Sequence, residues 1–254
     1  MKGLVYREIY LMRKALGTIL IVFFLFLLML SLFFISTYAG NLAKSEQSDQ
    51  NLNAFYPMAY IYTGALAILG FSGANSVIYD DYKSRWRLYS YTLPVDEKKM
   101  AFSMLLFRAI MLGAGFLLAL FGEVVLGIAA KKGVSVEHIK NLLLIAAFVP
   151  VSYLTIPLAL KNKEMSKTVI TLLLGGAVPV GAGIYGLVRF IIYSMKEAEI
   201  RYPGVEDDEA LKMVIRPYID KVMDIAVIAA PFVLVGSLVL SYHLTVRELK
   251  RRHY

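Results

Sequence analysis

The first apolar run of the chain, residues 18–35, reads TILIVFFLFLLMLSLFFI. It contains no charged residue, and as a helix rising about 1.5 Å per residue it nearly spans the hydrocarbon core of a bilayer. The apolar core of a secretory signal peptide is usually shorter, about 7–15 residues. More apolar runs follow it. We therefore expect this segment to remain in the protein as a membrane-spanning helix.

Five further apolar blocks follow, and the six together predict an all-α, polytopic membrane protein. Each block can cross about 30 Å of hydrocarbon as a helix. The alternation of polar and apolar residues that a barrel strand needs is missing. We predict one transmembrane domain over residues 1–254. The predicted spans are 17–39, 56–79, 100–130, 141–160, 168–193 and 222–243.

Basic residues flank these blocks unevenly, and this predicts the orientation. The chain has 27 Lys and Arg residues against 19 Asp and Glu, a formal net charge of +8. With the N-terminus inside the cell, 16 of the 27 fall in inner segments and nine in outer ones, which agrees with the positive-inside rule. We predict that both ends lie in the cytoplasm. Orientation explains the basic charge better than nucleic-acid binding does.

The residues before the first span form an amphipathic segment. Val5, Ile9, Met12 and Leu16 recur on one helical face, and basic residues lie opposite. We predict a separate N-terminal helix that lies in the headgroup layer. The alternative is a plain cytoplasmic extension of the first span.

The motifs of enzymes and nucleotide-binding proteins are missing or misplaced. The sequence has no GxxxxGK[ST] phosphate-binding loop, no HExxH and no GxSxG. It has no cysteine, which excludes thiolate metal sites, and its three histidines, at 138, 243 and 253, lack metal-ligand spacing.

Small residues inside the spans predict close helix packing. The letters of residues 181–186, GAGIYG, match a dinucleotide-binding motif, but inside a span they indicate a packing surface instead. The same reading applies to other pairs of small residues four apart. The predicted packing residues are Gly70, Ala74, Ala109, Gly113, Ala182 and Gly186.

Three charged residues inside the blocks are candidates for function: Arg108, Glu123 and Arg189. Ionisable side chains in a span are costly and often mark a functional pathway. Both arginines could instead extend toward a membrane surface. Glu123 could face a cavity or reach the outer interface, and we favour the interface.

The most informative polar stretch, residues 80–99, reads DDYKSRWRLYSYTLPVDEKK and contains the only tryptophan, Trp86. An aspartate at 80 or 81 can cap a short helix, and Pro94 should end it. One interpretation is an interfacial belt of aromatic and basic residues. The other is a cytoplasmic helix that docks on a partner through an aromatic anchor.

This stretch resembles the intracellular loop of bacterial ABC-2 type transporter permeases. The resemblance is closest to the exporters of phenol-soluble modulins and related peptides in Gram-positive bacteria. It rests on about 25 residues, although the architecture is similar over the whole chain. One departure is the basic Arg85-Trp86-Arg87, because relatives often have a glycine before the tryptophan. The matching positions are Asp80-Asp81, Trp86, Tyr89, Leu93-Pro94-Val95, Lys98-Lys99 and the opening Met1-Lys2-Gly3-Leu4 with Arg7-Glu8.

The resemblance implies a permease in the bacterial cell membrane that exports amphipathic peptides or other hydrophobic cargo. Two permeases, identical or paralogous, would form the pathway among the membrane lipids. The chain itself would hold no cofactor and would not be an enzyme; ATP and Mg would bind to separate ABC ATPase subunits. Those subunits would dock on a coupling helix at Asp80, Asp81, Lys83, Arg85, Trp86, Tyr89, Leu93 and Pro94.

Two other classes of function remain open from the sequence. One is an ion-coupled carrier or a channel, for which Pro179 hints at the broken helix that carriers often contain. The other is an intramembrane lipid-modifying enzyme that uses Glu123 with an arginine.

Overall fold

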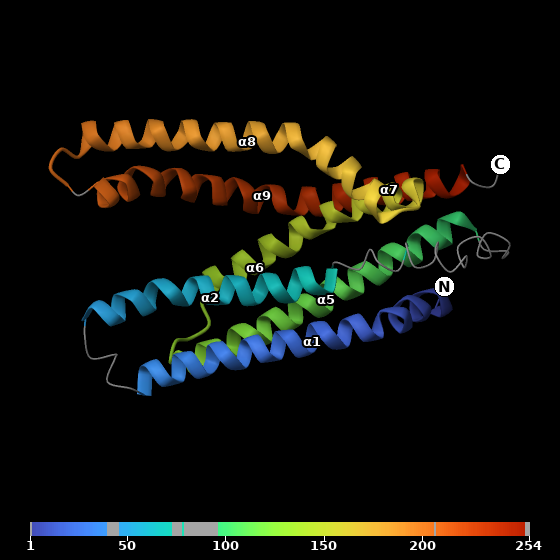
Figure 1. Cartoon of the computed structure of the whole chain (residues 1–254), viewed down its shortest axis with the longest axis horizontal. Helices are drawn as coiled ribbons and strands as arrows, with labels where there is room; N and C mark the ends of the chain where they lie inside the picture. The colour runs from blue at the N-terminus through green and yellow to red at the C-terminus, as the bar shows by residue number, and fades with distance from the viewer. Residues whose placement is uncertain (1, 40–45, 73–77, 79–95, 206, 252–254) are drawn as a thin grey trace. The chain divides into compact units, whose positions relative to one another are not determined.

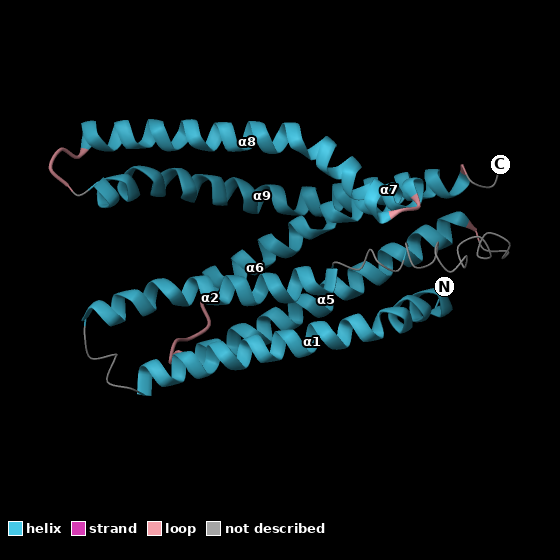
Figure 2. Cartoon of the chain, viewed as in Figure 1, coloured by secondary structure: helices cyan, strands magenta, loops and turns pink. Residues whose placement is uncertain are grey.

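The protein is described by a computed structural model that covers residues 2–39, 46–72, 78, 96–205 and 207–251. In these ranges every regular element is a helix and no strand is present, as Figure 2 shows. The prediction of an all-α protein is confirmed. The elements in Figure 1 are α1 (Lys2–Ala39), α2 (Glu46–Ser72), α5 (Glu97–Ala129), α6 (Val136–Phe148), the 3-10 helix η2 (Val149–Leu154), α7 (Thr155–Asn162), α8 (Met165–Arg201) and α9 (Asp207–Lys250).

The chain divides into two compact units. The first unit contains Met1–Lys161 and Val233–Tyr254, and the second contains Asn162–Phe232. Helix α9 therefore contributes its C-terminal part to the first unit and its N-terminal part to the second. The single domain over residues 1–254 stays a prediction.

Five stretches of the described residues are long and apolar enough to cross a membrane. They correspond to the first four predicted spans and the last one. The remaining predicted span, 168–193, falls within α8, whose described apolar stretch begins with Met165–Gly175, and its crossing of the membrane stays a prediction. The protein is thus a membrane protein by the length and composition of its helices. The five stretches are Gly3–Thr37, Phe55–Ser72, Glu97–Ala129, Val136–Asn162 and Glu209–Lys250.

Helices α1, α2 and α5 pack along one another and form most of the core of the first unit (Figure 1). Their buried side chains include Phe23 and Phe34 of α1, Ile68 of α2 and Leu126 of α5. The Phe34 ring also meets the ring of Tyr56 edge to face, with 5.7 Å between centroids. Many apolar side chains on the outward faces stay exposed, as lipid contact requires.

The backbones of α2 and α5 lie against each other at Gly115. A Cβ atom at this position would lie 2.9 Å from the carbonyl oxygen of Ala67 and 3.1 Å from Cα of Ile68. Two turns further along α5, a Cβ atom at Gly122 would lie 3.0 Å from the methyl carbon of Thr63. At Gly115 a side chain would collide with the backbone of α2, and at Gly122 it would crowd the Thr63 side chain. The absence of a side chain is therefore what allows the two helices to touch.

The structure describes the surroundings of five of the six packing residues predicted from small-residue spacing, and their packing role stays a prediction where no helix of the same unit covers them. Gly70 packs as predicted, since a Cβ atom there would lie 3.1 Å from Cγ2 of Ile19 on α1. Ala74 lies outside the described residues. The other four, Ala109, Gly113, Ala182 and Gly186, are exposed within their units. Spacing defines a face of one helix, but it does not say whether another helix of the unit covers that face.

Helix α1 runs without a break from Lys2 to Ala39, so the separate interfacial helix predicted at the N-terminus is not present. The predicted amphipathic face is present, but other helices of the same chain cover it. Phe71 of α2 and Phe107 and Met111 of α5 pack on it. The alternative interpretation, an extension of the first span, describes the structure. The face consists of the predicted residues Val5, Ile9, Met12 and Leu16.

The docking of this extension predicts a position-specific effect. Met12 is 4% exposed, whereas its neighbour Leu11 is 47% exposed. We expect Met12→Ala to lower the free energy of unfolding by about 2 kcal/mol or more, because it leaves a cavity. Leu11→Ala should change it by less than about 0.5 kcal/mol. Unfolding in mixed micelles by SDS titration measures both, and equal effects would contradict the docking of α1.

The predicted span 141–160 is not one regular helix. Helix α6 starts earlier, at Val136, where Ser135 Oγ accepts a hydrogen bond from the backbone N–H of Glu137 at 3.3 Å. At Val149 it changes to η2, which has Pro150 in its first turn. Proline removes a backbone donor, so a regular α-helical pattern is interrupted there. A 3-10 stretch within a helical run often marks a hinge or local strain.

The second unit is a helical hairpin of α8 and the first part of α9 (Figure 1). Its turn contains Gly204, whose φ of +91° favours glycine. The rings of Phe190 and Tyr218 meet edge to face across the hairpin, 5.4 Å apart. Both helices extend beyond the predicted spans 168–193 and 222–243, because the amphipathic segments next to the turn continue the helices.

Candidate functional site

Helix α5 carries two buried charged residues, Arg108 and Glu123. They are fifteen residues apart, which is about 22 Å along a helix. Arg108 is 3% exposed and Glu123 is 2% exposed. Each therefore forms its own polar site inside the first unit, and neither side chain extends to a surface of the unit.

The Arg108 site connects four elements. The guanidinium Nη1 donates a hydrogen bond of 3.5 Å to the carbonyl oxygen of Ser72 at the end of α2. The Tyr153 hydroxyl of η2 donates to the carbonyl oxygen of Arg108 at 3.0 Å, and the Tyr153 ring centroid lies 5.7 Å from the guanidinium carbon. From α9, Ser241 Oγ donates to the carbonyl oxygen of Tyr153 at 2.8 Å. The buried cation thus lies at a junction of the first unit.

The Glu123 site joins α5 to α6. Oε1 of Glu123 lies 2.5 Å from Nδ1 of His138, so the two side chains form a hydrogen-bonded acid–imidazole pair. The His138 side chain is 13% exposed. This differs from the favoured interpretation of the sequence, in which Glu123 reaches the outer interface. Helix α6 covers the carboxylate because the turn after α5 brings His138 back over it.

Aromatic side chains of α2 complete the Glu123 site. The His138 ring stacks on the ring of Tyr60, with 3.6 Å between centroids and 24° between planes. Asn141, one turn after His138, donates a hydrogen bond of 2.7 Å to the Tyr60 hydroxyl. The ring of Tyr56 lies 5.5 Å from that of His138, and Nζ of Lys132 lies 4.9 Å from the Tyr56 centroid.

Arg189 differs from the two charges on α5. It is exposed on α8, and its Nε donates a hydrogen bond of 2.9 Å to the hydroxyl of Tyr185 one turn earlier. Within the described ranges, no three acidic or histidine side chains come together as metal ligands would. All predicted contact residues of the coupling helix lie outside the described residues; they are Asp80, Asp81, Lys83, Arg85, Trp86, Tyr89, Leu93 and Pro94.

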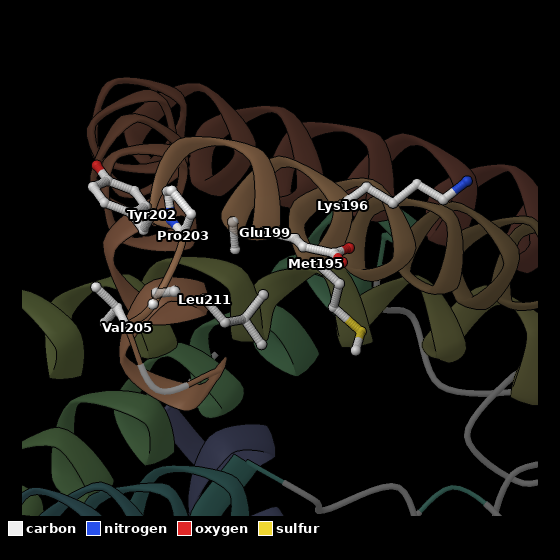
Figure 3. Close-up of a pocket in the computed structure, with 10 residues that line it drawn as sticks. Met195, Lys196, Glu199, Tyr202, Pro203, Val205 and Leu211 are labelled. Carbon is white, nitrogen blue, oxygen red and sulfur yellow. The ribbon is translucent and has the colours of Figure 1, made fainter.

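A pocket of about 380 Å³ lies at the turn between α8 and α9 (Figure 3). It has an apolar lining with one acid and one base, and none of the charges predicted to be functional lines it. Figure 3 shows the Lys196 side chain extending away from Tyr202, Pro203 and Val205 of the turn. The lining residues are Met195, Lys196, Ala198, Glu199, Tyr202, Pro203, Gly204, Val205, Ala210 and Leu211.

The partners of Arg108 and Glu123 are not singled out by the sequence. A weak signal exists for the second site: His138 and Asn141 are three apart, and Tyr56 and Tyr60 are four apart, so each pair shares one face of a helix. For Tyr153 and Ser241 the sequence contains no such signal, because 88 residues separate them.

Comparison of the chain with protein-family models, with curated proteins and with solved structures finds no match.

Proposed function

We propose that this chain is the membrane-spanning subunit of an ATP-driven exporter, and that a separate ABC ATPase docks on residues 80–99. The observation that carries the proposal is the place of this segment in the chain. It joins α2 to α5, the two helices whose backbones touch at Gly115. A force applied to the segment would act on a closely packed helix pair and move it as one body, as rigid-body switching requires.

The proposed topology places both termini and residues 80–99 in the cytoplasm, and α8 crosses the membrane as the fifth of six spans. Within the first unit, the start of α1, the start of α5 and the end of α9 lie at the same end, which supports one side for all three (Figure 1). The missing phosphate-binding loop also fits a division of labour with an ATPase. A second permease, identical or paralogous, would complete the pathway for amphipathic peptides or other hydrophobic cargo.

The buried charges do not favour the lipid-modifying enzyme. Arg108 and Glu123 lie about 22 Å apart along α5 and cannot act on one bond together. The carrier or channel stays an alternative, because the change from α6 to η2 at Val149 is a broken helix of the kind that carriers often contain.

Topology can be tested directly because the chain has no cysteine. A single cysteine at Ser84 should react with a membrane-impermeant maleimide only after the cells are opened. A cysteine at Val134, exposed in the turn at the other end of α5, should react in intact cells. Labelling of Ser84→Cys from outside would overturn the proposal.

The docking role predicts a loss of partner binding at Trp86. Trp86→Ala should weaken co-purification with the proposed ABC ATPase subunit by about 30-fold, the effect of removing an interface hot spot. Trp86→Phe keeps an aromatic anchor and should lose much less. Pull-downs from detergent measure both, with expression level as the control. Unchanged binding and transport in Trp86→Ala, and in Tyr89→Ala combined with Leu93→Ala, would remove the coupling role.

A further inference from the structure

A carboxylate and an imidazole are buried together where α2, α5 and α6 meet. Oε1 of Glu123 is 2.5 Å from Nδ1 of His138, and the imidazole ring lies flat against Tyr60. The second carboxylate oxygen, Oε2, is also buried and has no hydrogen-bond partner among the described residues. Within the part of the chain that the structure describes, the buried carboxylate therefore has a hydrogen bond at one of its two oxygens.

The other charged and titratable groups around the pair come from three elements. Helix α2 contributes the phenols of Tyr56 and Tyr60, and the turn after α5 contributes Lys132, whose ammonium lies over the Tyr56 ring. Helix α6 contributes Glu137, which is exposed. Phenols and ammonium groups ordinarily titrate near pH 10, and exposed carboxylates near pH 4. Within the described residues around this site, Glu123 and His138 are the two that share a direct hydrogen bond, so the variants below change the charge of this pair.

We propose that Glu123 and His138 form a proton-binding site, and that the bound proton holds the start of α6 against α2 and α5. A carboxylate next to a neutral imidazole has a net negative charge. One added proton, held by either group, makes the pair neutral and keeps the hydrogen bond between Oε1 and Nδ1. An uncompensated charge is costly in a buried site, so proton loss should weaken the packing of these helices.

The sign of the pH effect follows from proton linkage. A folded state that binds a proton more tightly than the unfolded state is stabilised at low pH, and this stabilisation is lost as the pH rises. The pair lies near the end of α5 opposite the start of α1. In the proposed topology it therefore senses acidity in the outer half of the membrane, but proton binding itself does not depend on the exporter function.

The test is the thermal midpoint of the full-length chain in detergent, measured at several values from about pH 5.5 to about pH 8.5, where histidine ordinarily titrates. The wild-type Tm should fall by about 3 °C or more over this range. In Glu123→Gln, which is neutral at every pH, the fall should be absent or reversed. His243→Gln, a change at an exposed histidine of α9, and Glu137→Gln should keep the wild-type profile.

A wild-type pH profile in Glu123→Gln would overturn the proposal, and so would a wild type without the fall. Should Glu123→Gln not fold, the double variant Glu123→Gln/His138→Gln replaces it. Its two amides can hydrogen-bond to each other but cannot titrate in this range. A flat profile for the double variant supports the proton site, and a retained fall contradicts it.

Discussion

Replacing Gly115 by leucine should destroy the packing of α2 on α5, whereas the same change at Gly113 should leave the protein folded. The two glycines are two residues apart on α5. The two variants therefore have the same amino-acid composition, and the new leucine lies at nearly the same depth in the membrane. A Cβ atom at Gly115 would meet the backbone of α2 at 2.9 Å and 3.1 Å, but nothing lies within 4 Å of the Cβ position at Gly113. Only the first substitution inserts atoms between two backbones.

The two leucine substitutions should change the free energy of unfolding in opposite directions. Overpacking usually costs about 1–3 kcal/mol, and a whole leucine against a backbone should reach or exceed the upper value. At Gly113, leucine should add up to about 0.8 kcal/mol of stability, because glycine is a poor helix former. SDS titration in mixed micelles, followed by circular dichroism, measures both. Equal losses at the two positions would show that α2 and α5 do not touch where the structure brings them together.

Replacing Tyr153 by alanine should have the second large effect. The side chain of Tyr153 is 0% exposed and lies between Arg108 of α5 and Ser241 of α9. Its removal leaves a large cavity, and such changes cost about 3–5 kcal/mol. It also removes the hydroxyl that donates to the carbonyl oxygen of Arg108, and the ring near the guanidinium.

A graded series separates these contributions. Tyr153→Phe keeps the ring and loses only the hydrogen bond, so it should cost about 1 kcal/mol. Tyr62→Ala is the matched control, because Tyr62 of α2 is 66% exposed and should lose less than about 0.5 kcal/mol. The free energy of unfolding in mixed micelles, measured for the three variants, ranks their losses of stability. If Tyr62→Ala cost as much as Tyr153→Ala, the burial of Tyr153 at this junction would be refuted.

Much of the architecture was predictable from local sequence. The long apolar runs indicate helices because lipid leaves no water to satisfy an exposed backbone, and five of the six predicted spans coincide with helices long enough to cross. The amphipathic face of residues 5–16 was also correct. What covers this face was not predictable, because Phe71 and Phe107 come from distant parts of the chain.

The sequence by itself determined the class of protein, the helical state and the approximate places of five of the spans, but not the ends of the helices. Only the tertiary structure decided that Gly115 packs and Gly113 does not, and that Glu123 meets His138. The physical reason is the solvent: lipid tails are as apolar as a protein core, so lipid-facing and helix-facing residues look alike in the sequence. Which face becomes buried depends on the shapes of helices that lie far apart along the chain.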